Sequence, residues 1–244
     1  MKIGLLMPAR ERINLNLTLI SSIITTVDDI NNVTLYIGID DDDPTRDIQI
    51  KIAKAIPFIK FIPIHNEGKF LGLGRMWNIL ARSCSEDIFG YIGNDMIFRT
   101  PGWDTKIINK FKNECPKDNI MLYHCDDGYR HGDLCVNAFV HRQYMNVVGY
   151  FIREEFLINW SDRWLHQMFG AFNRIEYIPD ILIEHNHWVF GKRKIDNTGK
   201  RMGEADQGGI SDRLWVALAP ERKKELELLS TYLKLNPDLS KVEL

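Results

Sequence analysis

The chain has 244 residues, 45% of them hydrophobic, which is enough to bury one sizeable core but little for two full domains. Its 31 basic and 33 acidic residues give a formal net charge of −2, which excludes a general attraction to nucleic acid or to an anionic membrane. The four cysteines lack C-x-x-C spacing, and no apolar run approaches the roughly 18 residues that cross a bilayer, so we expect a cytoplasmic protein without disulfides or a membrane span.

Apolar, β-prone runs alternate with segments of helical periodicity in the first half of the chain. We expect strands at residues 2–8, 33–39, 59–64, 88–92 and 119–124. The segments between them carry apolar residues three or four positions apart, which predicts helices at residues 14–27, 45–56, 72–84 and 102–113. This alternation is typical of an α/β fold with a mostly parallel central sheet flanked by helices.

The rhythm changes after Cys125. A polar loop, DDGYRHGD, precedes VNAFVHRQYMNVVGYF, and residues 156–172 then have the periodicity of a helix. A last apolar run covers residues 175–188. From Gly191 the chain is rich in Lys, Arg, Asp and Gly, which predicts a mobile loop at residues 191–209 and a short C-terminal helix that begins near Ser211.

Polar residues follow four successive expected strands. They are PARER at residues 8–12, DDDDP at 40–44, HNEGK at 65–69 and GND at 93–95. In an open parallel sheet, ligands bind beyond the carboxyl ends of the strands. The sequence therefore predicts a binding site at this edge, with two arginines, an acidic cluster, a histidine and a further carboxylate.

The acidic cluster after the second strand has two interpretations. Asp is favoured in turns, and this accounts for Asp42 and Asp43. Asp40 and Asp41 lie closest to the strand end, where a carboxylate accepts a hydrogen bond from a pyrimidine N–H or a ribose hydroxyl. For these two residues we favour nucleotide binding.

The glycine-bearing stretch GKFLGLGRMWN begins at Gly68 and does not match the G-x-G-x-x-G dinucleotide pattern. Its glycines allow the backbone to approach a phosphate at a helix N-terminus, with Lys69 or Arg75 adding positive charge. Helix breaking alone is an equally good explanation.

The segment GYIGNDMIFRTPGWD, residues 90–104, is the most specific in the chain. Asp95 lies on a short break between two β-like runs, and Pro101 and Gly102 begin a helix. A carboxylate held in this way can bind a divalent cation that bridges two phosphates, as Mg²⁺ or Mn²⁺ does. The alternative is a β-bulge with an exposed Asp.

The order PAR, DDDDP, Gly-Asn-Asp, TPGWD and a late His-Asn-His resembles the nucleotide-diphosphosugar transferases of the glycosyltransferase A fold, particularly the small family-2-like enzymes of bacteria and phages. The resemblance implies a Rossmann-like α/β domain over residues 1–190. Within it, residues 1–125 would form the nucleotide-binding half and residues 126–190 the acceptor half. Residues 191–244 would then form the mobile loop and C-terminal helix.

In that family a D-x-D element binds the metal and the donor diphosphate. Here Gly93 stands at the first Asp and Asn94 in the middle, so the resemblance implies Asp95 as the metal ligand and Asn94 as an oxygen contact. It also implies base binding by Asp40 or Asp41, and nucleoside contacts from the loop after the first strand, formed by Pro8, Ala9 and Arg10.

His185 and His187 follow the last apolar run, and alternate residues of a strand share a face. Two such imidazoles are a known metal-ligand arrangement, although a hydrogen-bonded strand end is the common alternative. The resemblance implies that a late histidine completes the site. Either residue fits, and we favour His187 for direct ligation.

Asp162 lies in the expected helix at residues 156–172, beside Arg163. A surface ion pair is the usual outcome for such a residue. The resemblance instead implies the acidic residue of the acceptor-side helix, which acts as general base in inverting enzymes. Arg130 is placed to contact the donor phosphate or the acceptor, whereas large aromatics such as Trp160 and Trp188 more often pack the core.

The function implied is metal-dependent transfer of a sugar from a nucleotide-diphosphate sugar to a hydroxyl acceptor, with Mn²⁺ or Mg²⁺ as cofactor. A glycan, a lipid-linked sugar, a protein and a modified DNA base all fit as acceptors, in a bacterial or phage-infected cell. The alternatives are a sugar nucleotidyltransferase, although PARERIN lacks the glycines expected there, and a non-catalytic nucleotide-sugar or carbohydrate-binding module.

The basic stretch after Gly191 directly follows the candidate metal histidines. We expect residues 191–209 to act as a lid that becomes ordered when metal and donor bind, with Lys192, Arg193 or Lys194 adding positive charge at the diphosphate. An ordinary charged surface loop is the alternative.

Overall fold

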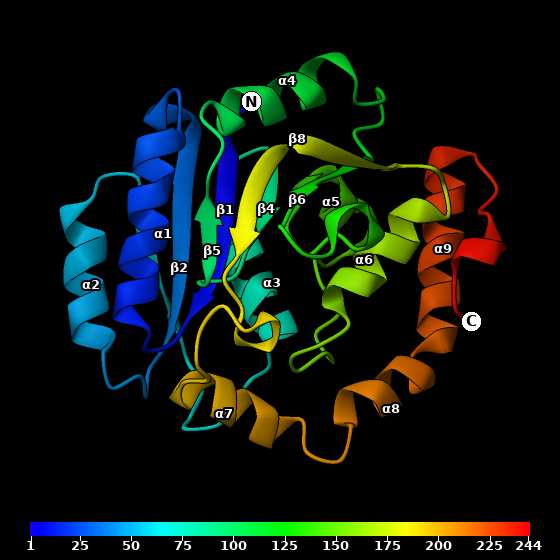
Figure 1. Cartoon of the computed structure of the whole chain (residues 1–244). Coiled ribbons are helices and arrows are strands. Elements are labelled where there is room, and N and C mark those ends of the chain that lie inside the picture. The colour runs from blue at the N-terminus through cyan, green and yellow to red at the C-terminus, as the bar shows by residue number, and fades with distance from the viewer.

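The computed structural model describes all residues, 1–244, and its centre is a curled eight-stranded sheet with helices packed around it (Figure 1). The strands are Ile3–Ala9 (β1), Val33–Asp40 (β2), Ile59–Ile64 (β3), Ile88–Tyr91 (β4), Met96–Phe98 (β5), Leu122–Asp126 (β6), Ala138–His141 (β7) and Ile175–His185 (β8). The helices are Ile13–Thr26 (α1), Arg46–Ala55 (α2), Leu73–Ser83 (α3), Trp103–Asn113 (α4), Gln143–Val148 (α5), Ser161–Gly170 (α6), Asn197–Ala205 (α7), Ile210–Ala217 (α8) and Ala219–Leu233 (α9). None of them combines the length and apolar character needed to span a bilayer.

The N-terminal half of the sheet is parallel, as the sequence predicts. Its strands lie in the order β3-β2-β1-β4, and all seven residues of β1 are buried. Strands covered on both faces are continuous apolar runs rather than alternating ones, which is why these segments stand out in the sequence. Their carboxyl ends, which carry the polar residues of the predicted site, therefore meet at one edge.

The C-terminal half of the sheet is mixed. The fifth expected strand is β6, but it does not lie next to β4, because β7 lies between them and is antiparallel to both. β6 pairs in parallel with β8, and the short β5 pairs antiparallel with the end of β8. Four of the seven pairings are parallel, so the mostly parallel α/β prediction is confirmed.

The segment expected as a loop at residues 191–209 contains helix α7. Asp196 caps this helix, because its side chain accepts a hydrogen bond from the Gly199 backbone N–H at 2.8 Å. The N-cap contact stabilises this helix. Its glycines and charged residues are typical of a loop, which is why the sequence does not predict it. The helix expected near Ser211 begins at Ile210, and a second helix, α9, follows it. Whether residues 191–209 become more ordered on ligand binding stays a prediction.

The C-terminal helix α9 is anchored by a buried carboxylate. Glu225 accepts hydrogen bonds from the hydroxyls of Tyr144 and Tyr150 and, at 2.9 Å, from the Trp164 indole nitrogen. Burial raises the pKa of this carboxyl, although the three donors oppose the shift. The contacts join α9 to α5 and α6, so the C-terminal segment is part of the folded core.

We expect Glu225→Ala to lower the free energy of unfolding by about 3 kcal/mol or more, since it leaves three donors without an acceptor in the protein interior. Urea unfolding followed by circular dichroism measures the change. Glu227 is exposed two residues further along the same helix, and Glu227→Ala should change the stability by less than about 0.5 kcal/mol. Equal stability of the two variants would contradict the anchoring role.

Candidate functional site

A cavity of about 630 Å³ lies at the carboxyl edge of the parallel strands and extends to α6 and α7. Most of the residues predicted from the sequence line it, although they come from elements far apart in the chain. These are Pro8, Ala9, Arg10, Asp40, Asn94, Asp95, Arg130, Asp162, His185 and His187.

Four predicted residues lie outside the cavity. Asp41 is exposed, with its Oδ2 2.8 Å from His65 Nδ1. Lys69 and Arg75 point to solvent around the start of α3, and Lys192 forms a 3.0 Å ion pair with Glu184. The structure does not bring these side chains to the site.

The candidate metal centre consists of Asp95, His185 and His187, whose potential ligand atoms all lie within 4.8 Å of one another. Asp95 lies on the break between β4 and β5, and the pairing of Met96 with His185 places β8 beside this break. The Asn186 N–H also donates to the Asp95 carbonyl at 2.8 Å. Backbone pairing therefore brings together residues about ninety positions apart.

The donor atoms of this cluster fit a divalent cation. His185 Nδ1 is buried and has no hydrogen-bond partner, and His185 Nε2 lies 3.4 Å from Asp95 Oδ1. Carboxylate oxygens and imidazole nitrogens are both ligand types that bind divalent metal ions in proteins.

The two histidines are not equivalent. The Val189 N–H donates to His187 Nδ1 at 3.2 Å, so the neutral His187 ring carries its proton on Nε2. If Nε2 bound a cation directly, the ring proton would have to move to Nδ1, and the hydrogen bond from the Val189 N–H would be lost. Although the sequence favours His187, the geometry favours His185.

The charge states of the cluster suit cation binding. Burial opposes ionisation of Asp95, but His185 and Arg12 outweigh it and hold the pKa of this carboxyl well below its usual range. Burial lowers the pKa of His187 to about 4, although the charge of Asp95 acts in the opposite direction. At neutral pH the site therefore offers a carboxylate and an uncharged His187 ring.

Two arginines frame Asp95. Arg193 donates to Asp95 Oδ2 at 3.0 Å, and Arg12 donates to Asn94 at 3.0 Å. Asp196 accepts from both guanidiniums at 2.8 Å. Arg12 is one of the two arginines that the sequence places at this edge, without a contact assigned to it, and Asp196 has no role in the sequence prediction. Arg12 lies within PARER. Asp196 precedes the capped helix α7, which the loop-like composition of this segment does not predict.

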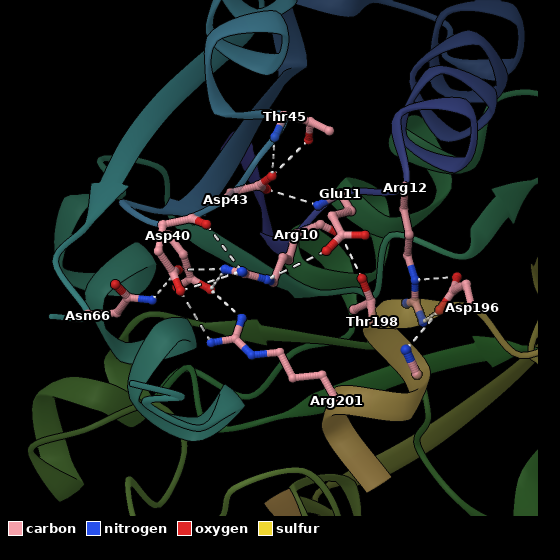
Figure 2. A network of polar contacts seen from close by, with 12 residues as sticks. Arg10, Glu11, Arg12, Asp40, Asp43, Thr45, Asn66, Asp196, Thr198 and Arg201 are labelled. Carbon is pink, nitrogen blue, oxygen red and sulfur yellow. Dashed lines mark hydrogen bonds and ion pairs between the residues drawn. The ribbon is translucent and has the colours of Figure 1, made fainter. Parts of the chain in front are cut away.

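Arginines also surround the carboxylate at the end of β2. Figure 2 shows Arg10 close to Asp40 and Arg201 reaching toward it from α7. Arg10 lies 3.3 Å from Asp40 and 2.6 Å from Asp42, and Arg201 lies 3.6 Å from Asp40. Burial raises the pKa of Asp40 against the opposing charges of the two arginines. Asp42 is thus an ion-pair partner rather than only a turn residue.

Asp43 has the turn role that the sequence predicts. Its carboxylate accepts hydrogen bonds from the Thr45 N–H at 2.7 Å and from the Glu11 N–H at 2.9 Å. The second contact joins the turn after β2 to the loop after β1 (Figure 2). Asp43 therefore holds these two loops together and leaves Asp40 facing the cavity.

Asp162, the second residue of α6, also lines the cavity. Its Oδ1 accepts a hydrogen bond from the Arg163 backbone N–H at 2.8 Å, while the Arg163 guanidinium pairs with Glu243 instead. Burial raises the pKa of the Asp162 carboxyl, with smaller opposing contributions. Trp160 and Trp188 line the same cavity, in contrast to their expected place in the core.

Comparisons with known proteins identify the fold. No protein-family model matches the chain, and no curated protein matches it by sequence. Staphylococcus aureus TarS, residues 1–349, matches with a TM-score of 0.57 and 11% identity, over 96% of this chain and 80% of that chain. The mannosyltransferase PcManGT from Pyrobaculum calidifontis, in complex with GDP-Man and Mn²⁺, matches with a TM-score of 0.57 and 10% identity, over 96% and 74%.

The chain has the fold of these glycosyltransferases. A further TarS structure, in complex with UDP-GlcNAc, matches with a TM-score of 0.57 and 12% identity, over 96% of this chain and 72% of that one. The glycosyltransferase A fold expected from the sequence is thereby confirmed.

Proposed function

We propose that the protein is a metal-dependent glycosyltransferase that moves a sugar from a nucleotide-diphosphate sugar to a hydroxyl acceptor. The observation that carries this proposal is the position of the Asp95, His185 and His187 cluster in one cavity with Asp40 and Asp162. The fold supports it, because the neighbouring structures contain UDP-GlcNAc, or GDP-Man with Mn²⁺.

We assign different roles to two groups of residues that line the cavity. Asp40, Arg10 and Arg201 form the group that would bind the nucleoside, where the carboxylate accepts hydrogen bonds and the guanidiniums donate them. Asp162 also lines the cavity and would take the proton from the acceptor hydroxyl, since burial raises its pKa and makes it a better base. A divalent cation held by Asp95 and His185 would neutralise the charge of the leaving nucleoside diphosphate.

Donor hydrolysis tests the proposal. Nucleotide sugars are screened by thermal shift with Mn²⁺, and the stabilising donors are then assayed for release of nucleoside diphosphate. A glycosyltransferase should hydrolyse at least one donor slowly, with water in place of the acceptor. Binding without turnover would instead support the carbohydrate-binding module, and formation of a nucleotide sugar from a sugar phosphate would support the nucleotidyltransferase.

The acceptor class follows from a second experiment. A glycan, a lipid-linked sugar, a protein and a modified DNA base are each incubated with the active donor and the enzyme. Only the true acceptor should gain the mass of one sugar. Mass spectrometry of the candidate acceptors distinguishes them. The Asp95→Ala protein serves as the negative control for each class.

Asp40 and Asp41 should differ in their contribution to nucleotide affinity. Asp40 lines the cavity and is buried, whereas Asp41 is exposed outside it. We expect Asp40→Ala to weaken binding of UDP or GDP by more than about tenfold, or about 1.4 kcal/mol, and Asp41→Ala to have little effect. Isothermal titration calorimetry with Mn²⁺ present measures both. An unchanged affinity for Asp40→Ala would leave this carboxylate with a structural role only.

A further inference from the structure

We propose that Arg193 couples the binding of the divalent cation to the binding of the nucleoside diphosphate. This inference rests on the proposed function and adds a positioning residue to it. In the free protein Arg193 would hold the metal-binding carboxylate and weaken cation binding. When the diphosphate binds, it would neutralise Arg193 and release this inhibition.

The first support is the division of contacts between the two oxygens of Asp95. Oδ2 accepts from Arg193 at 3.0 Å and lies 4.0 Å from Arg12. Oδ1 faces His185 Nε2 at 3.4 Å. One oxygen is thus turned toward the histidines, while the other is held by guanidiniums that repel a cation.

The second support is the local charge. Asp95 and Asp196 carry two negative charges, and Arg12 and Arg193 carry two positive ones, so the group has no net charge. The side chains of Asp95, Arg12 and Arg193 are only 7%, 9% and 12% exposed, so salt screens their interactions weakly. Affinity for hard cations increases with the negative charge of the ligands, and this site offers little.

The third support is the negative charge that the nucleoside diphosphate would bring to the site. A nucleoside diphosphate adds negative charge to the cavity, and a guanidinium binds phosphate oxygens with two parallel hydrogen bonds. When Arg193 exchanges Asp95 for a phosphate, the cation takes its place at the carboxylate, so no charge is left unpaired. By linkage, each ligand then increases the affinity of the other by the same factor.

Mn²⁺ binding measured without turnover tests this role. The loss of the electron paramagnetic resonance signal of free Mn²⁺ gives its affinity for the protein alone and with saturating UDP or GDP. We expect Arg193→Ala to bind Mn²⁺ on the order of tenfold more tightly in the absence of nucleotide, the equivalent of about 1.4 kcal/mol. We also expect the nucleotide to improve Mn²⁺ binding less in this variant than in the wild type.

Two further variants make the test specific. Lys200→Ala removes an exposed cation of α7 and should leave both affinities unchanged. Asp196→Asn retains a residue that caps α7 but removes a negative charge beside both arginines, so Mn²⁺ binding to the free protein should become weaker. Thermal melting establishes that each variant is folded.

An unchanged Mn²⁺ affinity in folded Arg193→Ala, without nucleotide, would overturn the inference. So would an equal gain in affinity for Lys200→Ala, because the effect would then reflect general surface charge. Failure of UDP and GDP to bind any of the proteins would contradict the proposed function instead. The effect of Arg193 on Mn²⁺ alone would remain measurable in that case.

Discussion

Replacing Asp95 by Ala should abolish Mn²⁺-dependent donor hydrolysis and leave the fold intact. Asp95 is the only carboxylate in the candidate metal cluster, so His185 and His187 remain without an anionic ligand. Electrostatic stabilisation by a bound cation contributes several kcal/mol to the transition state, and its loss corresponds to a fall of roughly 10³-fold or more in rate. The measurement is nucleoside diphosphate release as a function of Mn²⁺ concentration.

The fold should survive because the backbone of Asp95, not its side chain, holds the start of β5 beside the end of β8. Its carbonyl accepts the hydrogen bond from the Asn186 N–H at 2.8 Å, which Ala retains. Circular dichroism and thermal melting check this point. Asp41→Ala is the matched control, since it removes an exposed carboxylate outside the cavity. Normal turnover with normal Mn²⁺ dependence in Asp95→Ala would refute the assignment of the metal centre.

Asp162→Asn should have the second large effect, a fall of about 10²- to 10⁴-fold in donor hydrolysis, which is the usual contribution of a general base. The amide oxygen can still accept the Arg163 backbone N–H, so the side chain keeps its position but loses its basicity. Nucleotide and Mn²⁺ affinities should change much less than the rate, because the Asp162 side chain forms no hydrogen bond or ion pair with Asp40, Asp95 or His185. Stopped assays at saturating donor measure the rate, and calorimetry measures the affinities.

The control for Asp162→Asn is Asp47→Asn. Asp47 is also the second residue of its helix, α2, and is exposed. The substitution therefore reproduces the change of charge at a helix N-terminus without touching the cavity. Similar rates for the two variants would show that Asp162 is not the base. A loss of nucleotide binding in Asp162→Asn would assign it to donor binding instead.

The N-terminal half of the fold could be predicted from the sequence. Its strands are continuous apolar runs bounded by polar residues, and the helices between them have clear periodicity, so a short window of sequence contains the signal. The same rule places Arg10, Asp40 and Asp95 at one edge, because the carboxyl ends of parallel strands meet there. The sequence thereby determined the fold class, the site edge and the main carboxylates.

Only the tertiary structure decided how these residues are paired. His185 lies beside Asp95 because β8 pairs with β5, and β7 separates β4 from β6. The capped helix α7 brings Arg193 and Asp196 against the strand ends, although their composition indicates a loop. Strand partners and ion pairs between residues far apart in the chain depend on packing that no local periodicity records. The sequence could therefore place Arg12 and Arg193 near the site, but it could not identify them as the partners of Asp95.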